Sequence, residues 1–274
     1  MLIYHRDTKS YREEKEYRQN TLRFLYKTVI GRVLLHIIIA RPWFNQISSF
    51  YQKSKYSHKD IQPFIDEYQV DAKAEDFETF NDFFTRKREY NTKTTEKELI
   101  AIADGKLSVY QISEDLILNI KYSQYTLEEL VDNQLDVSDY KNGICLIYRL
   151  SVDDYHRYVY CDDGICVKKF FIKGMLHTIR PIASKYKAFS RNCRAVSVLK
   201  TKHFGDVIQI EIGAMLIGKI KNHLVDKFNK MDEKGYFEYG GSTIVLLLKD
   251  NVKIDEDIVN ETQVYIGERI GVLC

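Results

Sequence analysis

Proline and glycine are scarce in this 274-residue chain, which holds only 3 Pro and 13 Gly. Long flexible linkers and collagen-like repeats need far more of both, so the composition excludes them. Hydrophobic residues make up 45% of the chain and charged residues 29%, as in globular proteins and unlike disordered ones. The chain is therefore expected to fold into one large or two small domains.

An excess of charge of one sign is also missing, because 41 Lys and Arg residues nearly cancel 39 Asp and Glu residues. A chain-wide basic field is therefore absent, and no nucleic-acid partner is expected. The longest apolar run, residues 33–40, contains His36 and is too short to span a bilayer. The first twenty residues are polar and charged, which predicts no signal peptide.

The chain lacks the common cofactor and metal motifs. Its five cysteines are odd in number and include no CxxC pair, so neither a disulfide framework nor a zinc site is indicated, and reduced cysteines in a cytosolic setting are expected. A phosphate-binding GxxxxGK[ST] loop, a GxGxxG turn after a strand, HExxH and GxSxG are all missing. The seven histidines are scattered without ligand spacing, so no metal is expected.

A basic amphipathic segment stands out near the N-terminus. No acidic residue lies between Glu16 and Asp60, whereas eight Lys and Arg residues do. Apolar residues recur there at three- and four-residue steps, which predicts a helix capped by Asn20 or Thr21 and ended by Pro42. With Trp43 and Phe44 after it, this helix fits either an interfacial membrane helix or an ordinary helix packed on the core.

The predicted secondary structure changes from helix to strand after about residue 90. Residues 57–89 predict short helices with clustered aromatic side chains that are expected to be core. Beyond them, short β-branched and aromatic runs alternate with turn residues. We therefore predict an α+β fold with an N-terminal helical region over 1–90. A mainly antiparallel β-sandwich or barrel is predicted over 91–274.

Two glycines precede a Ser-Thr pair near the C-terminus, in the segment 239–248, which reads YGGSTIVLLL. A hairpin turn is one interpretation, since glycine reaches positive φ without steric cost. The other is self-attack of the backbone, in which Ser242 Oγ adds to the unhindered carbonyl of Gly241 once a base removes its proton.

Two further short segments offer partners for that chemistry. His156 follows an apolar run and stands among charged residues, so it is a candidate general base or a structural, hydrogen-bonded histidine. Asp104 lies in the turn Ala103-Asp104-Gly105, where it either orients a histidine or only shapes the turn.

These pieces, in this order, resemble the phosphatidylserine decarboxylase family over most of the chain. The resemblance rests on eight collinear segments: FNDFFTRKRE (80–89), ADG (103–105), DYHRY (154–158), GMLHTIRP (174–181), NCR (192–194), GAMLIG (213–218), GYF (235–237) and GGST (240–243). Ala103 stands where the family usually has proline.

The resemblance implies a proenzyme that cleaves itself. Ser242 would attack Gly241, the chain would break between them, and residue 242 would become a covalent pyruvoyl group. The products would be a β chain, 1–241, and an α chain, 242–274. Asp104 would orient His156, and His156 would act as the base toward Ser242.

The same resemblance implies that residues 1–90 form a membrane-associating region and residues 91–274 the catalytic domain, and it implies the activity and the place of action. The pyruvoyl group, acting as an electron sink, would form a Schiff base with the serine amine of phosphatidylserine. Carbon dioxide and phosphatidylethanolamine would result, with His156 donating the proton. The protein would sit peripherally on the cytoplasmic side of the cell membrane, where residues 21–44 would contact anionic lipid, and a homodimer would be possible.

One departure and several alternatives stay open. Many family members have a second histidine three residues after the first, but Val159 stands there, with His177 and His203 as reserve bases. A pyruvoyl decarboxylase of a soluble amine and an inactive or non-catalytic membrane-binding relative are the competing readings. Candidates to bind the lipid phosphate, with plain surface charge as their alternative role, are Arg157, Arg191, Arg194 and Lys221.

Overall fold

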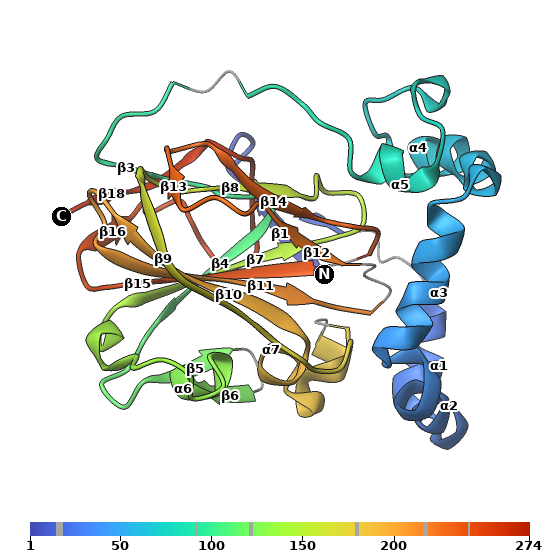
Figure 1. Ribbon diagram of the computed structural model, residues 1–274, viewed down its shortest axis with the longest axis horizontal. Coiled ribbons are helices and arrows are strands. Elements are labelled where there is room, and N and C mark those ends of the chain that lie inside the picture. The colour runs from blue at the N-terminus through green and yellow to red at the C-terminus, as the bar shows by residue number, and fades with distance from the viewer. Residues whose placement is uncertain (15–18, 91–92, 121–122, 179–180, 216–218, 241) are drawn as a thin grey trace.

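The structure, a computed structural model, describes residues 1–14, 19–90, 93–120, 123–178, 181–215, 219–240 and 242–274. A large, mostly antiparallel sheet forms the body, and a helical layer stands to one side of it (Figure 1). The predicted α+β class is confirmed. The body is an open sheet with smaller sheets against it, and its described strands do not close into a barrel.

The main sheet has ten strands in the order β13-β9-β10-β11-β15-β7-β4-β17-β1-β2. All neighbouring pairs are antiparallel except β1 with β17. In sheet order the strands are β13 (Lys227–Phe228), β9 (Gly164–Ile172), β10 (Arg194–Thr201), β11 (Asp206–Gly213), β15 (Ser242–Leu248), β7 (Ile144–Leu150), β4 (Gly105–Gln111), β17 (Thr262–Val264), β1 (Leu2–His5) and β2 (Ser10–Glu13).

Both faces of this sheet are covered. Ile244 and Leu246 of β15 belong to a hydrophobic cluster shared with the small sheet β12-β14-β8, whereas Val245 and Leu247 belong to a second cluster on the opposite face. A strand buried on both faces needs no polar alternation, which is why β15 is almost wholly apolar. The covering elements are β12 (Ile220–Asn222), β14 (Glu233–Phe237), β8 (Arg157–Val159), β5 (Ile117–Ile120), β6 (Ser123–Thr126), α6 (Leu127–Leu130), η4 (Ser138–Tyr140), η5 (Pro181–Tyr186), α7 (Ala188–Arg191), and the sheet of β16 (Val252–Ile254), β18 (Arg269–Leu273) and β3 (Glu98–Ile100).

The predicted N-terminal helix is in fact broken into several pieces. The structure has α1 (Gln19–Lys27), α2 (Val29–Leu34), a π-helical turn η1 (Leu35–Ile39) and α3 (Pro42–Gln52). Thr28 is extended and its side chain accepts a hydrogen bond from the Gly31 amide, so it starts a new helix. A Cβ at Gly31 would collide with the Phe24 carbonyl oxygen, so glycine permits the tight corner. Pro42 is the first residue of α3, a position where proline is favoured. It therefore begins this helix, whereas the sequence predicted only that it ends the previous one.

The first fourteen residues are not helical, although they fall in the region expected to be so. β1 and β2 form a hairpin that extends the main sheet. Glu14, which follows β2, accepts hydrogen bonds from Arg149 and Ser151 at the end of β7. The Arg149 guanidinium holds the pKa of this buried carboxyl down at about 2, against the opposing effect of burial.

An aromatic bundle joins the helical layer to the body. It is built on η2 (Lys55–Asp60), α4 (Ile61–Tyr68), η3 (Ala74–Asp76) and α5 (Phe80–Phe84). Phe64, Phe80 and Phe83 pack edge to face within it, as the aromatic spacing predicted. Tyr239, from the loop before β15, completes the same cluster. Among the described residues, no helix is long and apolar enough to cross a bilayer.

Candidate functional site

The three segments singled out in the sequence converge at one end of the main sheet. Ser242 begins β15 and pairs with Gly213, the last residue of β11, and with Leu150, the last residue of β7. Asp104 immediately precedes β4, which also pairs with β7. The chain leaves β7 and reaches His156 just before β8, which bridges back to Ala103. Antiparallel pairing thus brings residues that are far apart in sequence to the same end of the sheet, where these strands begin or finish.

Ser242 is fully buried, with 0% of its surface exposed. Its Oγ has no hydrogen-bond partner among the described residues. Burying a hydroxyl without a partner costs about 1–3 kcal/mol, so this serine is unfavourable for folding alone. Gly240, two residues earlier, has φ of +135°, a conformation that L side chains rarely adopt. Gly241, the other predicted cleavage residue, lies outside the described part of the chain.

The His156 ring is buried and held in one tautomer. Its Nδ1 lies 2.8 Å from the main-chain oxygen of Asp154, which can only accept, so Nδ1 carries the hydrogen. Nε2 then keeps its lone pair, and it has no hydrogen-bond partner of good geometry among the described residues. Phe84 packs on the ring with a centroid distance of 4.2 Å. The ring is therefore fixed in place, and its accepting nitrogen makes no hydrogen bond of good geometry in the described part of the chain.

Burial lowers the pKa of His156 to about 4, against the raising effects of the Asp154 charge and of the backbone of Asp154 and Gly240. The nearby Arg86 charge lowers it further. His156 is therefore neutral at pH 7, which is the form able to accept a proton.

The segment before Ser242 runs directly past His156. The main-chain oxygen of His156 accepts a 2.9 Å hydrogen bond from the Phe237 amide. Phe84 stacks on His156 and also contacts Tyr239 edge to face, at 5.2 Å. Glu238 is buried and forms a 2.8 Å ion pair with Lys53 at the end of α3. The structure thus places His156 beside residues 237–240, immediately before the predicted cleavage point.

Asp104 is buried at the same edge but has other partners. Its two oxygens accept from the Arg88 guanidinium at 2.6 and 2.7 Å, and one also accepts from the Ile266 amide at 2.9 Å. His156 is oriented instead by the hydrogen bond that its Nδ1 donates to the main-chain oxygen of Asp154. The orienting role of Asp104 toward His156 therefore stays a prediction, with Arg88 as an additional partner that the sequence did not indicate.

The reserve histidines lie in different places. His203 sits in the loop between β10 and β11, at the opposite end of β11 from Gly213, with Nδ1 2.9 Å from Asp162. His177 is nearer, since Asn192 bonds both its main chain and the Gly213 oxygen. Burial lowers the pKa of His177 to about 4. Val159, which stands where the resemblance led us to expect a second histidine, is buried in β8.

Two of the four candidate phosphate-binding cations prove to be structural. Arg194 is buried, and its guanidinium donates to the main-chain oxygens of Glu129, Leu130, Ser190 and Asn192. Arg157 is also buried, paired with Glu233 at 2.7 Å and bonded to the main chain after α5. Neither guanidinium is a solvated charge or open to a ligand. Sequence alone could not separate these roles, because the partners are mostly backbone oxygens.

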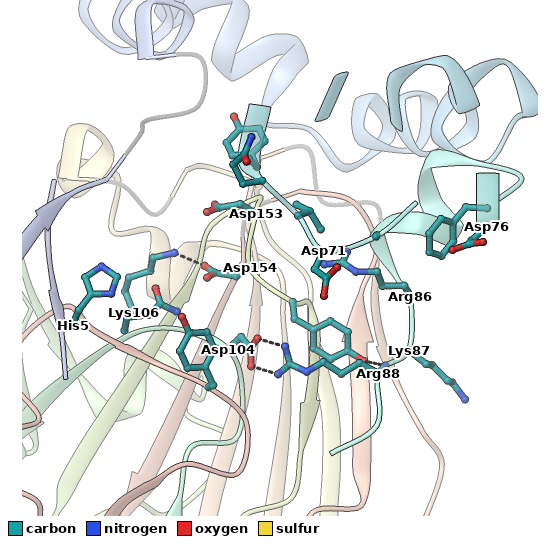
Figure 2. A pocket seen from close by; sticks show the side chains of 18 residues that line it. His5, Asp71, Asp76, Arg86, Lys87, Arg88, Asp104, Lys106, Asp153 and Asp154 are labelled. Atoms are coloured by element: carbon teal, nitrogen blue, oxygen red, sulfur yellow. Dashed lines mark hydrogen bonds and ion pairs between the residues drawn. The ribbon is translucent and has the colours of Figure 1, made fainter. Parts of the chain in front are cut away.

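A polar cavity of about 720 Å³ opens beside this edge. Figure 2 shows Arg86, Lys87 and Arg88 on one side, His5 and Lys106 on the other, and Asp104 and Asp154 between them. Asp154 pairs with Lys106 at 2.7 Å. In the described part of the chain, no cluster of three or more His, Cys, Asp or Glu side chains is arranged to hold a metal ion. The cavity is thus a charged chamber next to the His156 loop.

Comparison with known proteins gives matches over nearly the whole chain. A family model described as phosphatidylserine decarboxylase matches residues 80–272. Phosphatidylserine decarboxylase proenzyme 2 of Clostridium acetobutylicum is 50% identical over 283 aligned residues, which cover 98% of this chain and 97% of that protein. Phosphatidylserine decarboxylase proenzymes of Clostridium botulinum and Desulfitobacterium hafniense are 38% and 35% identical, each over 98% of this chain and 98% and 97% of their own lengths.

Proposed function

This chain belongs to the phosphatidylserine decarboxylase family, and we infer that it converts phosphatidylserine to phosphatidylethanolamine and carbon dioxide with a pyruvoyl group made from its own Ser242. The observation that carries this proposal is a pair of unused atoms at one end of the sheet. Ser242 Oγ and His156 Nε2 are both buried, and neither makes a hydrogen bond of good geometry within the described residues. A nucleophile and a base are the two groups that self-cleavage needs.

Cleavage begins when His156 Nε2 takes the Ser242 Oγ proton. Oγ then bonds to the Gly241 carbonyl carbon, the carbon–nitrogen bond between residues 241 and 242 breaks, and the freed nitrogen takes a proton to leave an ester. Loss of the Ser242 Cα proton breaks the Cβ–Oγ bond, so Gly241 departs as a carboxylate. One water then hydrolyses the remaining dehydroalanine to pyruvoyl and releases ammonia.

The surroundings of residue 242 fit this change. No hydrogen bond within the described residues depends on the Ser242 hydroxyl, so the fold loses none when that hydroxyl disappears. β15 lies between β11 and β7 in the middle of the sheet, which keeps the short α chain attached to the β chain after the break. A pyruvoyl group supplies an electron sink for decarboxylation of an attached amine. We assign to His156 Nε2 the return of its proton to the substrate carbon.

We also propose that the helical layer holds the protein on the cytoplasmic face of the cell membrane. Side chains that would normally be buried are exposed on α1 to α3, among them Ile30 at 68% and Phe50 at 81%. Further exposed apolar side chains in this region are Val29, Val33, Ile37, Trp43 and Ile47, and Arg23 and Lys27 of α1 are also exposed. Exposed apolar side chains together with cations suit an anionic lipid surface. A homodimer also stays a prediction.

Replacing Ile30 and Phe50 by serine is expected to weaken binding to anionic vesicles at least about tenfold, because two large apolar groups no longer enter the lipid. Neutralising Arg23 and Lys27 should weaken it further and reduce its salt dependence. Leu224→Ser is the matched control, because Leu224 is also an exposed apolar residue, at 87%, but lies in the loop after β12 and not on α1 to α3. Vesicle sedimentation measures the effect, and unchanged binding of the double variant would overturn the membrane proposal.

The activity itself is tested by carbon dioxide release from the purified, cleaved protein. We expect turnover of phosphatidylserine vesicles and no turnover of free serine, because the lipid supplies binding energy that the amino acid lacks. Equal activity on a soluble amino acid would favour the alternative of a soluble-amine decarboxylase. A cleaved protein inactive on both would refute the lipid decarboxylase.

A further inference from the structure

Arg86 is the feature of the cavity that the cleavage chemistry leaves unexplained. It follows α5 by two residues and lines the 720 Å³ cavity. Its guanidinium is partly buried, yet no carboxylate in the described part of the chain lies within ion-pair distance. The other arginines around the site are paired: Arg88 with Asp104 and Arg157 with Glu233.

The hydrogen-bonding capacity of Arg86 is largely unused. A guanidinium carries five N–H donors. The described contacts of Arg86 are one bond from a terminal nitrogen to the Phe83 oxygen, at 3.2 Å, and ring contacts with Phe83 and Tyr155 at 5.0 and 5.9 Å. Burial lowers the pKa of Arg86, although an arginine remains charged at neutral pH. A half-buried charged group without an ion pair is unfavourable, which points to an anionic partner.

Arg86 lies on the segment that carries Phe84 to His156. Phe84, two residues before it, packs on the His156 ring and contacts Tyr239 edge to face. The positive charge of Arg86 also lowers the pKa of His156. Two of the cavity carboxylates are already paired, Asp104 with Arg88 and Asp154 with Lys106, while Asp71, Asp76 and Asp153 also line the cavity. An anion entering the cavity meets in Arg86 a cation that has no ion pair within the described residues.

We propose that Arg86 binds the phosphodiester of the lipid substrate and so positions the headgroup beside His156. This inference rests on the proposed function, because it assigns the cation that receives its substrate. A guanidinium matches phosphate oxygens through two parallel hydrogen bonds. The substrate carboxylate is the less suitable partner: an interaction with it stabilises the ground state and disappears as carbon dioxide leaves, which would slow the reaction.

The test compares Arg86→Gln and Arg86→Lys on a short-chain phosphatidylserine kept below its critical micelle concentration, so that membrane binding does not contribute. Cleavage is first verified by intact mass. For Arg86→Gln we expect KM to rise at least about 30-fold while kcat changes less than about threefold. Arg86→Lys keeps the positive charge but loses the planar guanidinium that makes two parallel hydrogen bonds, so its KM should rise about five- to tenfold. Arg12→Gln, on exposed β2, is the control and should match the wild type.

Inhibition by short-chain phosphatidylethanolamine identifies the bound group, because this product keeps the phosphodiester and lacks the carboxylate. Its inhibition constant should rise in parallel with KM. A raised KM with an unchanged inhibition constant would assign Arg86 to the carboxylate and overturn the proposal, as would an unchanged KM. If Arg86→Gln is not cleaved, Arg86→Lys decides by the same two constants. A wild-type protein that is not cleaved would instead refute the proposed function.

Discussion

Ser242→Ala is expected to leave a single chain of 274 residues, whereas the wild type separates under denaturing conditions into residues 1–241 and 242–274 with a blocked second N-terminus. Decarboxylase activity should fall by more than about 10³-fold, because both the nucleophile and the source of the carbonyl group are lost. Folding should not suffer. The deleted Oγ is buried without a described partner, so its removal should leave the free energy of unfolding equal or about 1 kcal/mol higher.

Thr243→Val is the matched control for that variant. Thr243 is the next residue, is also fully buried, and its Oγ1 likewise has no described hydrogen bond, but it faces the opposite side of β15. We expect Thr243→Val to be cleaved like the wild type. Intact mass distinguishes the outcomes. Cleavage of Ser242→Ala at the same bond, or an uncut wild type, would remove the basis for a pyruvoyl group in this protein.

His156→Ala should slow cleavage by about 10²- to 10⁴-fold, the range for loss of a positioned general base. Nε2 is the only nitrogen of this ring that keeps a lone pair, because Nδ1 donates to Asp154. Added imidazole should restore part of the rate by occupying the space left beside Phe84. A thermal unfolding measurement shows whether the variant folds, which separates lost chemistry from lost structure.

His203→Ala is the control for this variant, because His203 lies at the other end of β11 and should leave the cleavage rate unchanged. His177→Ala tests the nearer reserve base. Normal cleavage of His156→Ala together with slow cleavage of His177→Ala would transfer the base role to His177. Normal cleavage in both variants would require a base other than His156 and His177.

The pH dependence of cleavage follows from the same residue. Burial holds the pKa of His156 at about 4, below the ordinary value of 6.5. The neutral, proton-accepting form therefore dominates at every pH well above 4, and acidification removes it only near that value. Precursor made in a short cell-free pulse and diluted into buffers should be cleaved at a nearly constant rate from pH 8 to about pH 5.5. A rate that halves near pH 6.5 would indicate a solvated histidine instead.

The sequence by itself determined the α+β class, the β-rich second part of the chain and the candidate groups Asp104, His156 and Ser242. Those features are local: apolar alternation, turn residues and short motifs can be recognised in the sequence without knowing what packs against them. The sequence also indicated the basic, apolar character of residues 21–44. It could not show that Gly31 allows a corner there, because the obstacle is the Phe24 backbone of another helix.

Only the tertiary structure decided which charges are structural and which are unused. Arg194 and Arg157 are held largely by main-chain oxygens, and a sequence gives no sign of such partners. Arg86 looked like one more cation in a charged run, and only the fold shows that it reaches the cavity without a described counter-ion. Asp104 was visible as a turn residue, but its pairing with Arg88 depends on how the chain after α5 crosses the sheet edge. Hydrogen-bond partners are set by contacts between distant segments, whereas element type is set largely by neighbours along the chain.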